Sequence, residues 1–356
     1  MTNSSPYDIL IIGAGPTGLA CAIEAQKAHC SYLVLEKGSI TETIRRYPAN
    51  MTFFSTPDLL SLDNIPFSSV NVRPTRREAL QYYRGVAEAQ KLNLRLHTRV
   101  CGIRKEVQGN SSGNISGNVS GNSNEYIFCI ETRRETSSNI SSDAPLEKIF
   151  ARRVIIATGY FDFTNRLGIL GEDLPHVSHY YDEPYRYTMQ DVVVVGGRNS
   201  AVEAALELWR HGARVTLVHR GEELSTSVKY WVRPDIDNRI KNGEIRALFS
   251  TQLTEIRTNT ALAKNSATGE TTTLPADFIF PLIGYRPDEH LLRGAGVHLN
   301  EILIPEYNAE TFETNVQGLY IAGSVACGCQ TWTIFIENGR NHARPVVADI
   351  LRSLGR

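Results

Sequence analysis

Residues 8–18, DILIIGAGPTG, decide the fold of the first part of the chain. The run DILII at 8–12 is short and apolar and ends in glycine, which is typical of a buried parallel strand. Gly13, Gly15 and Gly18 follow in the spacing G-x-G-x-x-G. In this pattern the first glycine permits a tight turn, the second lets a pyrophosphate approach the backbone, and the third lets a helix pack close to the strand.

The residues after this glycine turn complete a strand–helix–strand unit. A helix is predicted from Pro16 to Ala28, and a second strand from Tyr32 to Leu35 ends at Glu36. Phosphates are favoured at such a helix N-terminus. Glu36 lies 23 residues after the first glycine, where a carboxylate accepts hydrogen bonds from the ribose hydroxyls of an adenosine. The turn therefore predicts a dinucleotide site, with contacts from Gly13, Gly15, Pro16, Thr17, Gly18 and Glu36.

The same arrangement returns in the second half of the chain. Strands are predicted at Asp191–Val195 and Arg214–Val218, with a helix at Ser200–Gly212 between them. The connecting turn reads GGRNSA from Gly196, which matches G-x-G-x-x-A except that Arg198 replaces the middle glycine. The helix N-terminus that binds anions is still present. The sequence therefore predicts a second nucleotide-binding unit.

The two units differ in the residue that faces the ribose. His219 lies 23 residues after the first glycine of the second turn and is followed by Arg220. A carboxylate repels a 2′-phosphate, whereas arginine pairs with it. We therefore predict NADPH rather than NADH at the second site and FAD at the first. The predicted NADPH contacts are Gly196, Gly197, Arg198, Asn199, Ser200, His219 and Arg220.

Length and composition exclude several classes of protein. The chain has 356 residues, a length typical of about two domains. Lys and Arg number 37 and Asp and Glu number 38, and this balance excludes a general basic footprint for nucleic acid. No apolar run approaches the roughly 18 residues of a membrane helix, and no basic region precedes the first apolar stretch as in a signal peptide. We expect neither a nucleic-acid nor a membrane partner.

Cysteine and histidine usage points to a reducing compartment without a metal centre. Six cysteines are too few for a disulfide scaffold and fit the cytosol, so we expect a cytoplasmic protein. His176 and His179 lie three residues apart, but no further ligand cluster accompanies them, so no metal site is predicted.

Between the two units, three alternating segments predict a three-stranded β-meander: 94–106, 125–132 and 148–157. Residues 108–124, within its first hairpin, contain a GNxS repeat. Such a composition cannot build a core, so a low-complexity loop is predicted there.

Together these features predict an α/β fold with two Rossmann-like dinucleotide-binding domains. The FAD domain is predicted to be discontinuous, from 1–187 and 308–356, and to carry the meander. Residues 188–307 are the predicted NADPH domain.

Further motifs resemble those of the thioredoxin-reductase-like flavoproteins. That class has an A-T-G before the NADPH domain and an A-G-D near the C-terminus, and this chain has ATG at 157–159 and AGS at 322–324. Within the class, the chain is similar to the bacillithiol disulfide reductase family over nearly its whole length. The matching stretches are YPANMTFFSTPDLL (47–60), PTRREALQYYR (74–84), GGRNSAVEAALEL (196–208), HRGEELSTSVKYWVRPD (219–235), TNVQGLYIAG (314–323) and IFIENGRNHA (334–343).

The resemblance implies NADPH-dependent reduction of a low-molecular-weight thiol disulfide through FAD. Ser324 stands where the broader class has an Asp that holds the ribityl chain, and a hydroxyl there can still donate or accept a hydrogen bond. The residues that we add to the predicted FAD site are Lys37, Thr52, Val100, Thr158, Gly159, Gly323 and Ser324.

The route of the electrons beyond FAD is open from the sequence. Members of the family often have Cys at the position of Thr17, and the C-x-x-C pair of thioredoxin reductases is absent. Cys327 and Cys329 form the one close pair. They are weak candidates for a redox relay, because a helix N-terminus expected beside them would lower a thiol pKa. The alternative is that both pack a crowded turn.

Several acceptors and functions therefore remain as alternatives. A small-molecule disulfide is favoured by the resemblance, and a small redox protein such as ferredoxin or flavodoxin needs no internal thiol pair. A flavin monooxygenase is a further alternative, although the segment 171–181 places four residues between Gly171 and His176 where that class has three. A redox-sensing flavoprotein that signals by conformation is the non-enzymatic one. Homodimers are common in such families, but the sequence reveals no interface.

Overall fold

The computed structural model describes residues 5–107, 126–135 and 145–356. The predicted low-complexity loop, 108–124, lies outside these residues. The chain divides into two compact units, of which unit 1 comprises 1–46, 51–163 and 285–356, and unit 2 comprises 47–50 and 164–284. Among the described helices, none combines the length and apolar character needed to cross a membrane.

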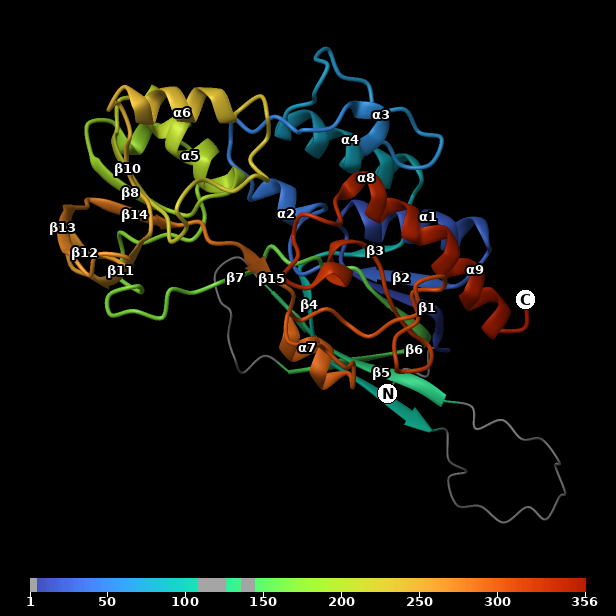
Figure 1. The fold of residues 1–356 in the computed structure, drawn as a ribbon. Helices are drawn as coiled ribbons and strands as arrows, with labels where there is room; N and C mark the ends of the chain where they lie inside the picture. Colours follow the sequence, from blue (N-terminus) through green and yellow to red (C-terminus); the bar gives the residue numbers. More distant parts are fainter. Residues whose placement is uncertain (1–4, 108–125, 136–144) are drawn as a thin grey trace, which may run out of the picture. The chain divides into compact units, whose positions relative to one another are not determined.

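Unit 1 is built on a seven-stranded sheet (Figure 1). Its central strand β1 pairs in parallel with β2 on one side and β6 on the other, and β16 also pairs in parallel with β6. The parallel strands are β1 (Tyr7–Ile12), β2 (Tyr32–Leu35), β3 (Leu94–Arg95), β6 (Glu147–Ile156) and β16 (Leu319–Ile321). Five of the six residues of β1 are buried, which explains its unbroken apolar sequence.

The predicted meander is confirmed as β4 (Thr98–Val107), β5 (Tyr126–Arg134) and β6, which pair antiparallel in that order. The sequence did not reveal that β6 serves two sheet regions. Residues 147–151 of β6 pair with β5, whereas residues 154–156 pair with β16, and β1 lies along its other side. One strand therefore joins the meander to the parallel part of the sheet.

Helices complete unit 1. Helix α1 (Pro16–Lys27), predicted at 16–28, packs against β1, β2 and the C-terminal helix α9 (Ala343–Ser353) (Figure 1). Helix α4 (Arg76–Ala89) begins with a capping box, in which Thr75 Oγ1 accepts from the Glu78 N–H and the Glu78 carboxylate accepts from the Thr75 N–H. The shorter helices are α2 (Glu42–Arg45), α3 (Pro57–Leu60), α7 (Glu289–Gly294) and α8 (Ile336–Gly339), with 3₁₀ turns η2 (Gly323–Cys327) and η3 (Arg340–His342).

Unit 2 contains a four-stranded parallel sheet in the order β10-β9-β8-β14. Its strands are β8 (Asp191–Val195), β9 (Arg214–Val218), β10 (Arg246–Leu248) and β14 (Phe278–Pro281), and its helices are α5 (Asn199–Arg210) and α6 (Arg233–Lys241). A separate antiparallel sheet consists of β11 (Thr251–Ile256), β12 (Thr260–Asn265) and β13 (Thr271–Pro275). Unit 2 also contains η1 (Tyr185–Tyr187). The paired short strands β7 (Phe163–Thr164) and β15 (Tyr285–Arg286) lie where the chain passes from one unit to the other.

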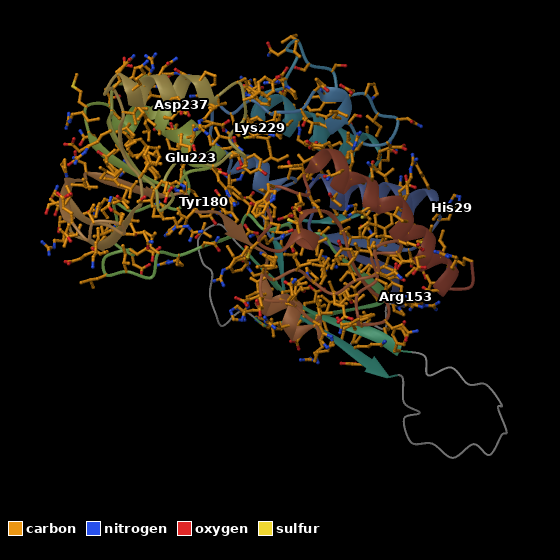
Figure 2. All side chains as sticks on the ribbon, viewed as in Figure 1. His29, Arg153, Tyr180, Glu223, Lys229 and Asp237 are labelled. Carbon is orange, nitrogen blue, oxygen red and sulfur yellow. The ribbon has the colours of Figure 1, made fainter. Side chains whose placement is uncertain are left out.

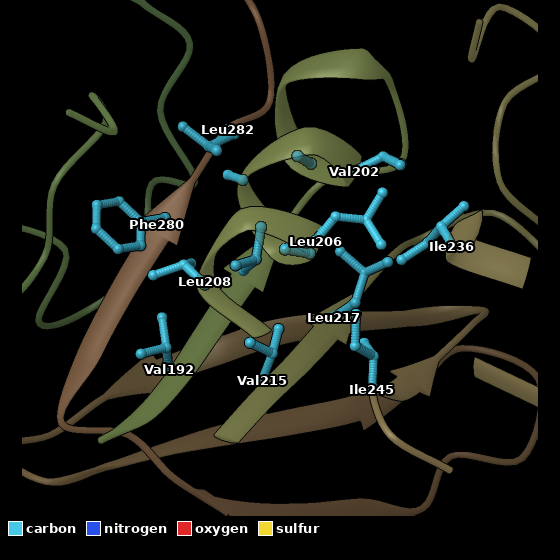
Figure 3. Close-up of a cluster of buried hydrophobic side chains, with 14 of the residues drawn as sticks. Val192, Val202, Leu206, Leu208, Val215, Leu217, Ile236, Ile245, Phe280 and Leu282 are labelled. Atoms are coloured by element: carbon cyan, nitrogen blue, oxygen red, sulfur yellow. The ribbon is translucent and has the colours of Figure 1, made fainter. Parts of the chain in front are cut away.

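The core of unit 2 explains the apolar pattern of its second strand–helix–strand segment. Leu206 and Leu208 of α5 lie against Val192, Val215 and Leu217 of the sheet (Figure 3). All five side chains are buried. The predicted helix, 200–212, is therefore present as α5, held to the sheet by one apolar face.

The contacts divide the chain at positions other than the predicted domain boundaries. The predicted boundaries were 187/188 and 307/308, whereas the units meet at 163/164 and 284/285, and a short segment, 47–50, joins unit 2. The predicted boundaries described cofactor domains, and these stay a prediction.

Truncation of the unit 2 core is expected to destabilise the protein. Leu206→Ala removes a side chain that is 2% exposed and should lower the free energy of unfolding by about 3 kcal/mol, through lost burial and the cavity left behind. Leu170→Ala, in the same unit but 75% exposed, should change it by less than about 0.5 kcal/mol. Urea denaturation of both variants measures the difference, and equal losses would contradict this account of the core.

Candidate functional site

In unit 1, four parallel strands bring the predicted FAD residues to one edge of the sheet. Because β2, β6 and β16 all run parallel to β1, either directly or through β6, their carboxyl ends lie on the same side. Residues from Gly13, Glu36, Ala157 and Ala322 onward leave these four ends. Segments more than 300 residues apart in sequence therefore meet at one edge, where open α/β sheets bind ligands.

The three glycines of the first turn are required for different reasons. Gly13 has a φ of +108°, and a Cβ there would lie 2.6 Å from the Ala157 carbonyl oxygen. A Cβ on Gly18 would lie 1.9 Å from the carbonyl oxygen of Gly13. At Gly15 nothing lies within 4 Å of a Cβ, and Gly15 caps a helix with no side-chain hydrogen bond of its own. The first and third glycines are thus needed by the fold, and the second leaves room for a ligand.

Glu36 fixes the glycine turn from the end of β2. Its carboxylate accepts the Ala14 N–H at 2.8 Å and the Gly38 N–H at 2.9 Å. Burial raises the pKa of Glu36, and the two N–H donors act in the opposite direction. A carboxylate offers about four lone-pair sites, so these two bonds leave acceptor capacity for ribose hydroxyls, which is the role predicted for Glu36.

Lys37 has a partner that the sequence did not indicate. Its ammonium lies 2.5 Å from the Asp162 carboxylate, which also pairs with Arg46 at 2.7 Å. Asp162 follows the ATG turn by three residues. No motif marks Asp162 or Arg46, because this ion-pair group forms only when the ends of β2 and β6 come together.

The C-terminal turn meets both earlier turns of unit 1. A Cβ on Gly159, whose φ is +68°, would lie 3.2 Å from Ser324 Oγ. A Cβ on Gly323, whose φ is +75°, would lie 2.6 Å from Thr17 Oγ1. Thr17 is thus buried against Gly323, and Ser324 is the more accessible residue of the turn. The three predicted motifs around Thr17, Thr158 and Ser324 form one cluster.

A histidine that sequence reasoning missed also belongs to this cluster. The Gly323 N–H donates to His342 Nδ1 at 3.2 Å, and the His342 ring stacks on Phe312 with centroids 4.0 Å apart. Burial lowers the pKa of His342 to about 4. The imidazole is therefore neutral near pH 7 and able to accept this hydrogen bond. His342 is the second-last residue of the matching stretch IFIENGRNHA, but its spacing carries no motif.

Two residues assigned to the FAD site lie on other elements. Thr52 is exposed and forms an isolated bridge with Thr75. Val100 lies in β4, at a bulge between Val100 and Gly102. Their contact with a dinucleotide stays a prediction.

In unit 2, the second turn accommodates its arginine without strain. Gly196 has a φ of +147°, and a Cβ there would lie 2.6 Å from the Leu282 carbonyl oxygen. Arg198 caps α5 with an extended backbone, φ −115°, which any residue adopts, and it is exposed. The missing middle glycine is therefore no obstacle to the turn, and a cation stands at the N-terminus of α5.

The imidazole of His219 packs on this turn. A Cβ on Gly197 would lie 2.4–2.5 Å from the His219 ring, and one on Gly221 would lie 2.8 Å from His219 Nε2. The pKa of His219 is lowered by burial first, and then by the charges of Arg220 and Arg198. Both arginines therefore act electrostatically on the same imidazole, and together they make the end of β9 a site that favours an anion.

Asn199 holds the loop that follows His219. Its side-chain Nδ2 donates to the Ser227 carbonyl at 3.1 Å, and its Oδ1 accepts the Lys229 N–H at 2.9 Å. The Ser225 N–H adds a bond to the Gly197 carbonyl at 2.9 Å. Figure 2 labels Lys229 in this loop. Asn199 was predicted to contact NADPH directly, and the structure adds a positioning role that the motif alone does not indicate.

Helix α5 carries a glutamate, Glu203, whose pKa is unusually high. The pKa of Glu203 is raised to about 7, first by burial and then by the charge of Glu207 one turn later, while the charge of Lys229 acts in the opposite direction. Glu207 itself accepts from Asn50 Nδ2 at 3.0 Å. The sequence shows two glutamates four residues apart, but only the packing of α5 distinguishes them.

The structure contradicts the expected activation of the cysteine pair. Cys327 lies at the end of the short turn η2, not at the N-terminus of a helix, and its thiol lies 3.0 Å from the Ser324 carbonyl. Burial raises the pKa of Cys327 to about 11 and also raises that of Cys329. Both thiols are free. The prediction of a lowered thiol pKa is wrong because desolvation of the buried thiol outweighs any dipole effect.

The segment that resembled a monooxygenase marker has a structural role. Glu172 is buried and accepts the N–H groups of Leu167 and Gly168 at 2.7 and 2.8 Å. His179 Nε2 lies 3.3 Å from the same carboxylate.

Within the described residues, no group of three or more His, Cys, Asp or Glu side chains is arranged to hold a metal ion.

Substitution at two neighbouring glycines should separate ligand binding from folding. Gly15→Ala should leave the free energy of unfolding of the flavin-free protein within about 0.5 kcal/mol but reduce its flavin content, because its methyl group enters the space left for a phosphate. Gly18→Ala should destabilise the flavin-free protein as well, since its Cβ meets backbone. Denaturation and the absorbance of bound flavin measure the two effects, and loss of fold in Gly15→Ala would contradict this division.

Removing the charge of Glu203 should stabilise the protein increasingly as the pH rises from about 4.5 through 7. Its folded pKa lies above the unfolded value of 4.5, so its stabilising contribution is complete below pH 4.5 and is lost as the pH rises through 7. Glu203→Gln should therefore be more stable than the unsubstituted chain by about 3 kcal/mol at pH 8.5, with little difference at pH 4.5.

The exposed Glu223 provides a matched control in the same unit (Figure 2). Glu223→Gln should show no such dependence on pH when both variants are unfolded in urea across this range. A gain in Glu203→Gln that is equal at both pH values would contradict the raised pKa.

Known proteins resemble this chain over most of its length. The family model described as pyridine nucleotide-disulphide oxidoreductase matches residues 10–112 and 118–323. Bacilliredoxin reductase Bdr of Bacillus subtilis (strain 168) is 39% identical over 96% of this chain and 97% of its own length.

Solved structures agree with this. Bacillithiol disulfide reductase Bdr (YpdA) from Bacillus cereus is 36% identical, with a TM-score of 0.88 over 98% of this chain and all of that one. The thioredoxin reductase of T. acidophilum, 21% identical with a TM-score of 0.71 over 99% of this chain and 100% of that one, shares the fold. The chain belongs to the pyridine nucleotide-disulphide oxidoreductases and, among them, to the family of the bacillithiol disulfide reductase Bdr.

Proposed function

We propose that this protein is an FAD-dependent oxidoreductase that takes two electrons from NADPH and passes them to a low-molecular-weight thiol disulfide of the bacillithiol type. The observation that carries the proposal is the pair of glycine turns. Each follows a parallel strand and opens a helix, but one is held by Glu36 and the other lies beside Arg198 and Arg220. The overall reaction consumes one NADPH and one proton and yields NADP⁺ and two thiols for each disulfide reduced.

Unit 1 is the proposed FAD-binding unit. The turn around Gly15 offers open space and the N-terminus of α1 to a pyrophosphate, and Glu36 is fixed where an adenosine ribose is expected. We assign the hydrogen bond to the ribityl chain to Ser324, which is partly exposed and lies beside Gly159. When bound, FAD supplies the capacity to accept a hydride from NADPH and to deliver two electrons to a disulfide.

Unit 2 is the proposed NADPH-binding unit. The N-terminus of α5 and Arg198 would bind the pyrophosphate, and Arg220 would pair with the 2′-phosphate. His219 is held neutral beside these cations and closes the glycine turn. The proposed cofactor-binding domains keep the boundaries predicted from the sequence, near 188 and 307. The contacts described for each site lie within one of the two compact units.

The proposed acceptor comes from outside the chain. Thr17 replaces the cysteine often found in the family and is buried against Gly323, so it cannot form a mixed disulfide. The raised pKa values of Cys327 and Cys329 disfavour thiolates near pH 7. The chain's own part in the reduction is therefore to bind and orient the cofactors. Electrons reach the disulfide without a thiol relay in the part of the chain that the structure describes.

A protein acceptor is the second candidate. The absence of an activated cysteine pair among the described residues favours it, because a redox protein supplies its own redox group. The relative from Bacillus subtilis is named as a bacilliredoxin reductase, whereas the structure from Bacillus cereus is named as a bacillithiol disulfide reductase. These two names correspond to the two acceptors to be compared.

Cofactor choice is tested by anaerobic reduction of the purified protein. The flavin absorbance bands should bleach with one equivalent of NADPH and hardly with NADH. Arg220→Ala should raise the KM for NADPH at least about ten-fold, because a charge-assisted bond to the 2′-phosphate is lost, and leave that for NADH unchanged. Arg257→Ala, an exposed arginine paired with Glu255, is the matched control. A colourless protein that cannot be reconstituted with FAD would overturn the proposal.

The acceptor is then tested with the reduced enzyme. Bacillithiol disulfide should give NADPH consumption with release of free thiol, whereas transfer only to a bacilliredoxin, ferredoxin or flavodoxin would support the second candidate. Oxygen uptake in step with an organic substrate would instead indicate a monooxygenase. Replacement of both Cys327 and Cys329 by Ala should leave disulfide turnover in place, and its loss with NADPH oxidation retained would establish a thiol relay.

A further inference from the structure

We propose that His342 is a positioning residue of the FAD site, which binds the Gly323 N–H and thereby sets the turn that presents Ser324 to the cofactor. This inference rests on the proposed function, because it assigns FAD to unit 1. It adds a residue from the C-terminal segment that no glycine motif includes. It also assigns a purpose to a half-buried histidine that the proposed reaction does not otherwise use.

One hydrogen bond joins the His342 side chain to the turn after β16. His342 Nδ1 accepts from the Gly323 N–H at 3.2 Å. Because Nδ1 is the acceptor, the ring proton lies on Nε2. Gly323 is buried, and a buried N–H without a partner is costly. His342 therefore satisfies a donor that the tight turn after β16 would otherwise leave unpaired.

The imidazole of His342 is held in place by aromatic side chains. It stacks on Phe312, with ring centroids 4.0 Å apart and an interplanar angle of 23°, and Phe312 in turn stacks on Tyr307. The Phe312 carbonyl accepts the Ile321 N–H at 3.0 Å from the end of β16. The same segment thus fixes both the strand and the ring that binds the turn after it.

The bond between His342 and Gly323 affects which residue of the turn can contact FAD. Gly323 was among the residues predicted to contact FAD, but its N–H group is bonded to His342. Ser324, the next residue, is accessible and lies beside Gly159. His342 therefore selects which residue of the turn faces the cofactor, by drawing the Gly323 N–H away from it.

The opposite side of Gly323 shows that the turn has little freedom. Its Cβ position lies 2.6 Å from Thr17 Oγ1, and a Cβ on Gly339 would lie 3.1 Å from Gly323 Cα. The turn is confined by Thr17 and Gly339 and is bonded to His342. A small displacement after loss of the His342 bond would therefore be transmitted to Ser324 and Thr17, both in the proposed FAD site.

The test compares three substitutions of His342 in the flavin-loaded protein. Asn places a side-chain acceptor near the position of Nδ1, Gln places its amide near the position of Nε2, and Phe keeps an aromatic ring without an acceptor. The rate of FAD release after dilution, followed by flavin fluorescence, should rise at least about five-fold in His342→Phe and His342→Gln. His342→Asn should remain within about two-fold of the unsubstituted protein.

The visible circular dichroism of bound flavin provides a second measurement, since a general loss of stability does not change it while FAD stays bound. It should change in His342→Gln and not in His342→Asn. His290→Phe, an exposed histidine of unit 1, should change neither quantity. If His342→Phe does not fold, the comparison of Gln with Asn still decides.

The outcomes separate this inference from the proposed function. Unaltered FAD release and dichroism in His342→Phe and His342→Gln would overturn the positioning role while the flavin assignment stands. Equal effects of Asn and Gln would also overturn it, because the position of the acceptor would then be irrelevant. An unsubstituted protein that binds no FAD would instead overturn the proposed function.

Discussion

The parallel pairing of β6 with both β1 and β16 is the constraint on which the proposed FAD site depends. It places the ends of strands from the beginning, middle and end of the chain at one edge of a single sheet. Tight contacts follow from that alignment, such as Gly13 against Ala157 and Gly323 against Thr17. Because β6 also carries the meander through β5, an error in its register would disturb both parts of unit 1.

Glu36 illustrates how one side chain serves both fold and site. Its carboxylate binds the N–H groups of Ala14 and Gly38, which ties the glycine turn to the end of β2. The equivalent position in unit 2 holds His219, which packs on Gly197 by shape rather than by hydrogen bonding to the turn. The same backbone architecture is thus stabilised by an anion in one unit and lies among cations in the other, and this contrast underlies the proposed difference in nucleotide.

Desolvation decides the protonation state of several buried groups. It raises the pKa of Cys327 despite its position after a glycine turn, and it lowers that of His342 so that a neutral imidazole accepts a hydrogen bond. It also raises the pKa of Glu203 on α5. These effects depend on the density of neighbouring atoms, which residues far apart in the chain provide.

The sequence by itself determined the local units: the strand, glycine turn and helix beginning at Asp8, their repetition at Asp191, and the three meander strands. These patterns are local because a glycine at positive φ, an apolar run and a helix start are specified by neighbouring residues. Only the tertiary structure decided that β6 belongs to two sheet regions, that Asp162 pairs with Lys37 and Arg46, and that His342 reaches Gly323. Those contacts join residues 19 to more than 120 positions apart, and no short spacing specifies them. They arise from the alignment of strand ends and from the close packing around the turns.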